Sequence, residues 1–332
     1  MDIIGILSAS LQEALGPTAV VYALAAIGLN VTFGYTGLLN FGQAGFMAIG
    51  GYTMAAFVST WDQPFWLALL AGLFFTLVLA VLLGIPTLRL RADYLAIVTI
   101  AASEIIRQTL GSVTLLEYFG GQDGVINYRG TFRSWNLLDK AGLSFDWLPW
   151  SNAELWLMLV GWIVVALSCL LVWLLAKAPY GRVLKGIRED EDAVRSLGKN
   201  VYWYKLQSLM IGGTFGALAG FAVALQKSNM APTWVATDVT FFAYTVLLLG
   251  GAARVLGPVV GSVIFWFLLV MIEQVLKALT IPSDPILPTW LLTSNEASNV
   301  RFILLGLALM LLMIFRPQGI FGDKKELAID GR

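Results

Sequence analysis

The chain alternates long apolar runs with short polar connections along its whole length. Most runs approach the roughly 20 residues that a helix needs to cross a bilayer. Backbone groups in lipid must bond within their own segment, so such runs are helices. The pattern predicts an all-α, polytopic integral membrane protein with about nine transmembrane helices, or ten if a Gly-rich or short run hides another crossing. The runs cover residues 18–33, 38–60, 65–88, 94–111, 154–176, 206–226, 239–253, 258–280 and 302–315.

Composition agrees with this class and restricts the chemistry. Of the 332 residues, 58% are hydrophobic and 13% are charged, against about 25% charged in soluble domains. The 21 basic and 21 acidic residues balance, so no overall basic surface predicts a nucleic-acid partner. The chain has no His, which removes His bases and His metal ligands, and its one Cys, Cys169, lies in an apolar run. We expect no metal site and an inert Cys169.

The placement of basic residues predicts orientation. Fourteen of the 21 Lys and Arg residues fall on alternate connections, the largest group of them in 177–204. These connections are expected in the cytoplasm, with the C-terminus inside and the N-terminus outside. No Lys or Arg occurs in Met1–Pro17, so we expect no cleaved signal peptide. The loop 112–153 is then external, and its Trp135, Trp147 and Trp150 either anchor it at the lipid interface or receive an external partner.

The cytoplasmic segment 177–204 combines basic and acidic residues. Its apolar positions recur at helical spacing beside a charged face, which predicts an amphipathic helix over 183–197. The acidic run 189–192 is not explained by topology, because acids on the positive side do nothing for orientation. Two interpretations remain open: a loop that only sets orientation, or a helix that docks into a groove on a cytoplasmic partner.

Glycines interrupt two other stretches. Six occur in 34–51, which also holds Asn40 and Gln43, and this density favours either a helix broken around a buried site or very close helix packing. A second interrupted stretch, 247–262, runs in the opposite sense, which hints at an inverted repeat. Gly212, Gly216 and Gly220 recur every four residues and predict a face for helix contact.

Charges within the apolar runs are few and come in pairs. Glu104 can pair with Arg107, and Glu273 with Lys277, because each pair is separated by three or four residues. A proton relay would need an unpaired acidic residue at mid-depth of a membrane span, and the sequence places none there. The sequence also lacks a phosphate-binding G-x-x-x-x-G-K-[ST] loop, so another chain must hydrolyse ATP if ATP drives transport.

Five motifs in order make the chain similar to the permease subunits of bacterial branched-chain amino acid ABC importers, and most similar to the LivM-type subunit. They are N-F-G-Q-A-G-F-M-A-I-G-G-Y (40–52), R-L-R-A-D-Y-L-A-I-V-T (89–99), Y-G-R-V-L-K-G-I-R-E-D-E-D-A-V-R-S-L-G (180–198), L-G-G-A-A-R-V-L-G-P-V-V-G (249–261) and F-R-P-Q-G-I-F-G (315–322). The likeness extends across residues 18–322. It implies one transmembrane permease domain, 1–322, of the ABC importer permease fold, followed by a short cytoplasmic tail, 323–332.

The resemblance also implies partners and roles. The partners are a sister permease, two cytoplasmic ATP-binding subunits that use ATP and Mg²⁺, and an extracytoplasmic substrate-binding protein, all at a bacterial inner membrane. Segment 177–204 then contains the coupling helix that contacts an ATPase, as the E-A-A…G loop of ABC importers does. The coupling residues expected from this pattern are Arg188, Glu189, Asp190, Glu191, Asp192, Ala193 and Gly198, with Asp192 standing where the loop often has Ala.

The expected substrate pathway involves Asn40, Phe41 and Gln43, with Asn30 as a further candidate. Ala253-Arg254 departs from the Gly-Thr that relatives commonly carry, which leaves the role of that turn open. The function implied is ATP-driven import of branched-chain amino acids by alternating access, with no enzymatic site or cofactor in this chain. Two alternatives are a related permease for urea or short amides, and a self-sufficient channel or ion-coupled carrier.

Overall fold

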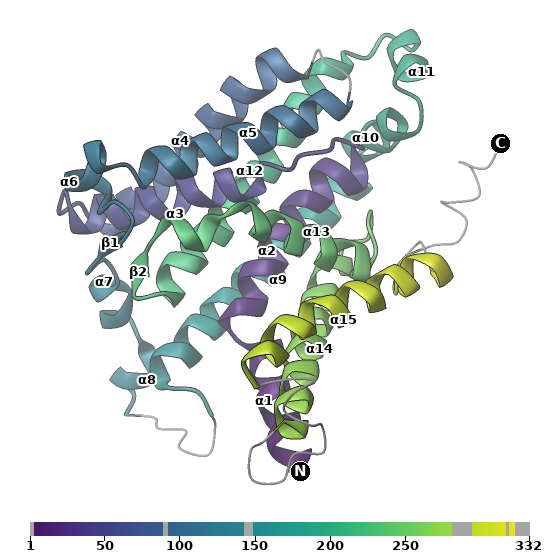
Figure 1. Ribbon diagram of the computed structural model, residues 1–332. Helices are drawn as coiled ribbons and strands as arrows, with labels where there is room; N and C mark the ends of the chain where they lie inside the picture. The colour runs from purple at the N-terminus through teal and green to yellow at the C-terminus, as the bar shows by residue number, and fades with distance from the viewer. Residues whose placement is uncertain (1–2, 89–91, 143–148, 281–293, 317–318, 323–332) are drawn as a thin grey trace.

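The structure is a computed structural model that describes residues 3–88, 92–142, 149–280, 294–316 and 319–322 (Figure 1). Arg89, Arg91, Trp147 and the tail 323–332 lie outside the described residues. All nine apolar runs contain helix. The long helices are α2 (Pro17–Leu29), α3 (Gln43–Ser59), α4 (Phe65–Thr87), α5 (Ala92–Leu110), α9 (Asn152–Lys177), α12 (Val201–Gln226), α13 (Thr237–Gly250), α14 (Gly257–Leu279) and α15 (Ser294–Phe315).

Within the described residues, five helices are long and apolar enough to cross a membrane by length and composition. They are α4, α9, α12, α14 and the continuous helix Pro17–Tyr35. The all-α membrane class is therefore confirmed. The shorter α3 and α13 differ from the predicted runs because the segments next to them, 36–42 and 251–256, leave the helical conformation.

The centre of the bundle is formed by α2, α3 and α12, which pack on one another and are the most buried of the long helices. Contact between α3 and α12 depends on small residues. A Cβ atom on Gly220 would lie 2.1 Å from the carbonyl oxygen of Met47, so no larger residue fits there. Gly212 and Gly216 likewise face α2 and α3. The predicted contact face on α12 is confirmed.

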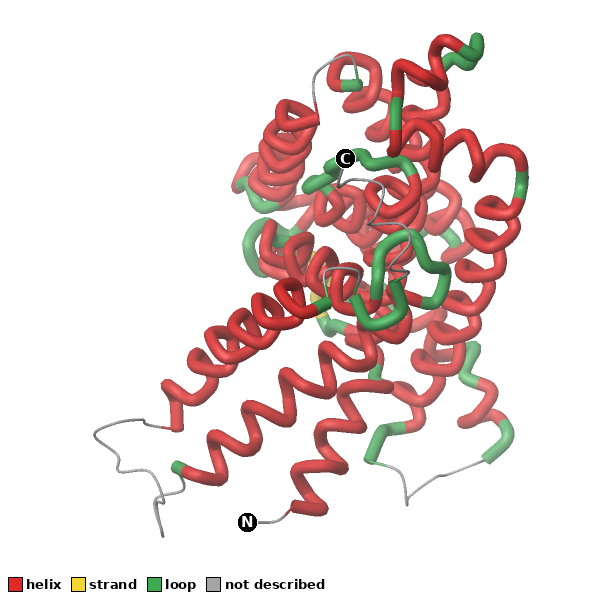
Figure 2. The backbone as a smooth tube through the Cα atoms, turned by 90° about the vertical axis from the view of Figure 1, so that its right-hand side faces the viewer, coloured by secondary structure: helices red, strands yellow, loops and turns green. Residues whose placement is uncertain are grey.

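Three helices project together from this bundle. Figure 2 shows α14, α15 and the N-terminal helix α1 (Ile3–Leu15) side by side, and α14 packs against both of the others. The sequence patterns did not predict α1. Its outward side is strongly apolar, with Ile4 82% exposed. Ser262 on α14 donates to the carbonyl of Ala19 at 2.7 Å and fixes α14 against α2.

Short elements cover the two ends of the bundle. At one end lie the connections after α5 and after α12, which meet as two-residue strands, with Val125 opposite Met230 in an antiparallel pair (Figure 1). The opposite end carries α10 and α11. The short elements are η2 (Val113–Leu115), α6 (Leu116–Phe119), β1 (Val125–Ile126), α7 (Gly130–Ser134), α8 (Leu137–Lys140), α10 (Pro179–Glu189), α11 (Glu191–Ser196), β2 (Asn229–Met230) and η3 (Pro232–Val235).

The predicted ion pairs within helices are present. Arg107 Nε donates to Glu104 Oε2 at 2.9 Å, and Lys277 Nζ donates to Glu273 Oε1 at 2.6 Å. Arg301 on α15 also contacts Glu273, which ties α14 to α15. Cys169 is buried with a free thiol, as expected. Each of these five charged side chains thus has an opposite charge beside it.

Candidate functional site: a broken helix joined to an exposed helix pair

The Gly-rich stretch breaks a membrane helix. Helix α2 continues as a π-helix over Asn30–Tyr35, then the chain turns through 36–42 and re-enters as α3. Gly37 has φ +74°, a conformation that side chains with a Cβ rarely adopt, so glycine is required at this turn. The prediction of a broken helix is confirmed. Close packing, the alternative interpretation, also holds nearby, at the contact between α3 and α12.

Asn30 connects this break to the second glycine-interrupted stretch. Its Oδ1 accepts a hydrogen bond from the Ala253 N–H at 2.8 Å, and its Nδ2 donates to the Arg254 carbonyl at 2.8 Å. The side chain is 1% exposed. One buried amide side chain therefore provides a partner for one N–H and one carbonyl group in the turn between α13 and α14. The structure thus brings the two interrupted stretches into contact.

Asn40 and Gln43 hold the start of α3. Asn40 Nδ2 donates to Gln43 Oε1 at 3.2 Å, and Asn40 Oδ1 accepts from the Gly42 N–H at 3.0 Å. Gln43 Nε2 donates to the Gly212 carbonyl on α12 at 3.2 Å. Both side chains are fully buried. In this conformation their polar groups are satisfied by the protein itself.

Phe41 is the only one of the four expected pathway residues that is partly exposed. Its ring centroid lies 4.7 Å from that of Tyr244 and 5.6 Å from that of Phe241. Phe241 is 49% exposed, so these rings form a surface between the turn and α13. The four expected pathway residues thus lie together at the helix break 30–42, but only the Phe41 side chain is partly exposed there.

The sequence patterns did not indicate the hydroxyl groups that hold this turn. Thr36 and Ser208 share a hydrogen bond of 2.7 Å, and Tyr244 donates to the Asn40 carbonyl at 3.0 Å. Thr99 accepts from the Phe41 N–H at 3.1 Å, and Thr240 accepts from the Ala44 N–H at 2.9 Å. The hydroxyls of Thr99, Ser208 and Thr240 each interrupt an apolar run. That interruption was the only available signal, and it does not distinguish a tertiary contact from a bond to the residue's own helix.

The prediction of a single amphipathic helix over 183–197 is wrong, because two helices, α10 and α11, cover this segment. Asp190, with φ −154° and ψ 103°, ends α10 and begins α11. Its Oδ1 accepts hydrogen bonds from the Asp192 and Ala193 N–H groups, both at 3.0 Å. This is a helix N-cap, which Asp favours over the helix interior. Leu197, expected on the apolar face, is 80% exposed as a result.

Helix α10 is attached to the broken helix. Leu184 and Ile187 are buried on its inner face. Arg188 extends from the same helix, and its Nη1 donates to the Gly34 carbonyl at 2.6 Å. The Arg188 side chain also packs over Gly37, where an added Cβ would lie 3.0 Å from its Cγ. The exposed helix pair is therefore joined to the π-helix by a charge-assisted hydrogen bond.

The remaining expected coupling residues have different environments. Glu191 contacts Lys205 on α12 and pairs with Arg195 at 2.8 Å, so it attaches α11 to a membrane helix. Glu189 is exposed, and its side chain makes no hydrogen bond or ion pair within the described part of the chain. Asp192 pairs only with Arg195, and its side chain is 87% exposed. Ala193 and Gly198 are exposed as well. Together these residues present an acidic surface with apolar positions beside it.

A multi-pass helical membrane protein with paired helix breaks is the class that the fold defines. Residues 15–315 match the sequence profile of a family described as "Branched-chain amino acid transport system / permease component". The chain belongs to this family. No solved structure is a significant match to the chain.

Individual relatives agree with the family assignment. The high-affinity branched-chain amino acid transport system permease protein LivM of Escherichia coli K12 is 32% identical over 314 residues, which cover 90% of this chain and 67% of that protein. The "Probable branched-chain amino acid transport permease protein LivM" of Methanocaldococcus jannaschii is 26% identical, with 91% of both chains covered. A nucleoside ABC transporter permease, NupC of Lactococcus lactis, is 25% identical over 69% of this chain.

Proposed function

We propose that this chain is the permease subunit of an ATP-driven importer of branched-chain amino acids in a bacterial cytoplasmic membrane. It acts with a sister permease, two cytoplasmic ATP-binding subunits and an external substrate-binding protein. The family match and the names of its LivM relatives support the substrate class. ATP and Mg²⁺ belong to the partner subunits, and this chain provides the path and the mechanical link.

The contact between Arg188 and Gly34 is the observation that carries this proposal. It joins an exposed pair of helices directly to a break in a membrane helix. The same break reaches the turn between α13 and α14 through Asn30. A displacement of α10 by an ATPase would therefore be transmitted to both interrupted stretches. A loop that served only to set orientation would not require such a link.

The orientation that we propose rests on the basic residues concentrated in 177–204. We place α10 and α11 in the cytoplasm and the strand pair at the external end, with the C-terminus inside and the N-terminus outside. We also propose nine crossings, of which five are long and apolar enough by length and composition. The nine are the helix Pro17–Tyr35, α3, α4, α5, α9, α12, α13, α14 and α15. Helix α1 has 13 residues, about 20 Å at 1.5 Å per residue, which is too short to cross about 30 Å of hydrocarbon.

The substrate pathway passes the surface of the turn 36–42. Phe41, whose ring makes tilted contacts with Phe241 and Tyr244, forms part of its wall. Asn30, Asn40 and Gln43 determine where this wall lies, because their hydrogen bonds hold the turn and the start of α3. Irregular backbone at membrane depth is tolerated where it is buried in protein or lines a cavity.

Reconstitution in proteoliposomes tests the proposal. Leucine uptake is expected with the sister permease, both ATPases, the binding protein and internal ATP, and this chain alone should give none. Flux through the chain alone would contradict the proposal and favour a channel or carrier. A complex that moves urea or acetamide, but not leucine, would contradict the assigned substrate class.

A further inference from the structure

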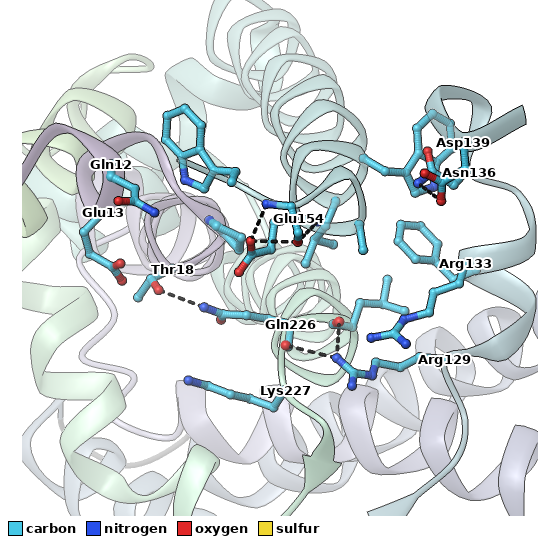
Figure 3. Close-up of a pocket in the computed structure, with 18 residues that line it drawn as sticks. Gln12, Glu13, Thr18, Arg129, Arg133, Asn136, Asp139, Glu154, Gln226 and Lys227 are labelled. Atoms are coloured by element: carbon cyan, nitrogen blue, oxygen red, sulfur yellow. Dashed lines mark hydrogen bonds between the residues drawn. The ribbon is translucent and has the colours of Figure 1, made fainter. Parts of the chain in front are cut away.

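A polar cavity lies at the end of the bundle opposite α10 and α11. It has a volume of about 640 Å³ and is formed where α1 ends, α2 and α9 begin, and α12 ends, with α7 closing one side (Figure 3). Gln226 lines it, and Gly212, the contact of Gln43, precedes Gln226 by 14 residues on α12, about 21 Å along the axis. The cavity is therefore separate from the pathway proposed above.

Two of the three cationic side chains that line this cavity lie on its α7 side, and the third, Lys227, lies over the Trp234 ring at 4.2 Å from its centroid. Arg129 Nη1 donates to the Gln226 carbonyl at 3.3 Å, which leaves the rest of its guanidinium free to bind a ligand. The side chain of Arg133, one turn further on, makes no hydrogen bond or ion pair with any described residue. Burial lowers the pKa of Arg129, and repulsion from Arg133 lowers it further. A guanidinium group binds anions through charge-assisted hydrogen bonds, so an anionic group between the two arginines would be stabilised.

Carboxylates line the same cavity without neutralising these arginines. Glu13, at the end of α1, makes no ion pair or side-chain hydrogen bond within the described residues, and Figure 3 shows it across the cavity from Arg129 and Arg133. Glu154 accepts from Ser151 at 2.8 Å, and Asp139 accepts from Asn136 at 2.7 Å. Both of these carboxylates are therefore engaged by neutral neighbours, and the Glu13 carboxylate stands apart from the two arginines.

This separation of charge favours a ligand that carries both a negative and a positive group. A simple anion would bind the arginines but would meet the carboxylates, and a simple cation would meet the arginines. A zwitterion places its negative end on Arg129 and Arg133 and its ammonium toward Glu13. The volume falls within the range of small-molecule sites, about 300–1,000 Å³. Trp150 and Trp156 in the wall are residues typical of the membrane interface.

We propose that this cavity binds a zwitterion that carries an ammonium group and a carboxylate or phosphate. Two sources present this pair of charges at the outer surface: a free amino acid and the headgroup of phosphatidylethanolamine. The site goes beyond the proposed transport path, and its occupancy requires no ATPase.

Binding to the purified full-length chain in detergent tests this proposal independently of transport. The probes are radiolabelled leucine by equilibrium dialysis and phosphatidylethanolamine by native mass spectrometry. Phosphatidylglycerol and inorganic phosphate serve as anions without an ammonium group. The variants Arg133→Gln and Glu13→Gln remove one charge each, and Arg129 is kept because it also binds the end of α12. Lys140→Gln on α8 removes a charge outside the cavity and is the matched control.

We expect Arg133→Gln and Glu13→Gln each to weaken zwitterion binding by about tenfold, the scale of one lost charge-assisted bond, with no change for Lys140→Gln. Binding of leucine alone identifies a free amino acid as the ligand, and binding of the lipid alone identifies a headgroup. The proposal is overturned if neither binds, if phosphatidylglycerol or phosphate binds as tightly as the zwitterions, or if the cavity variants behave like Lys140→Gln.

Discussion

Two interruptions of helix lie next to each other in this protein and have opposite environments. In the break 30–42, polar side chains are buried, and Asn30, Asn40 and Gln43 find their partners inside the protein. Between α10 and α11, the break at Asp190 is capped locally, and the charges around it are exposed. Membrane depth requires internal partners. Exposure to water leaves the second set available to another subunit.

The comparison also separates structural residues from contact residues within one motif. Of the four acids at 189–192, Asp190 caps α11 and Glu191 contacts Lys205 on α12. Glu189 and Asp192 face solvent. An acidic run that is uniform in the sequence therefore has two functions in the fold, and substitutions within it should have distinct effects.

The largest expected effect on stability is that of Asn30→Ala. The change leaves the Ala253 N–H and the Arg254 carbonyl without their buried partner, at a cost of about 3 kcal/mol in the free energy of unfolding. Asp190→Ala, which removes an exposed cap, should cost about 1 kcal/mol. Denaturation in mixed micelles followed by circular dichroism measures both. Equal losses would remove the distinction between the two breaks.

Arg188→Ala should weaken the connection between the breaks. Loss of its bond to the Gly34 carbonyl costs about 2 kcal/mol of local stability, and leucine transport by the full complex should fall about tenfold. ATP hydrolysis by the complex should persist, because the substitution lies in this chain and leaves the ATP sites unchanged. Arg182→Ala, an exposed change on the same helix, is the matched control. Equal transport by both variants would argue against a mechanical link.

The smallest expected effect is a gain in the stability of the folded chain. Ala253 has φ +60°, a left-handed conformation that costs a residue with a Cβ about 1 kcal/mol. Ala253→Gly relieves this strain, although glycine also makes the unfolded chain more flexible. We expect a net stabilisation of about 0.5 kcal/mol, visible as a higher midpoint in the same denaturation assay. A loss of stability would show that the Ala253 methyl group contributes packing that outweighs the strain.

Much of the fold was predictable from local patterns. The run 65–88 became α4 with almost the predicted bounds, because a continuous apolar segment without polar partners has few alternatives in lipid. Helix α1 was missed, since its polar residues interrupt a short apolar segment. The break at Asp190 was missed because an aspartate among charges fits a solvent-exposed helix face as readily as a cap.

The candidate site was predictable only in part. Gly-rich spacing indicated the break at 34–51, but the partners of Asn30 lie 223 and 224 residues away in the chain. No local pattern encodes such a pairing. The cavity that contains Arg129 and Glu13 is built from the ends of several helices, so each of its charges looked like an ordinary loop residue in the sequence.

Charge reversal at Glu191 and Asp192 tests the central claim most directly. The full complex with Glu191→Lys and Asp192→Lys should keep hydrolysing ATP but lose most leucine uptake. The matched variant Glu117→Lys with Asp123→Lys, exposed at the opposite end of the bundle, should keep both activities. Such a result would locate coupling at α10 and α11. Unchanged uptake per ATP hydrolysed after reversal at Glu191 and Asp192 would contradict the account.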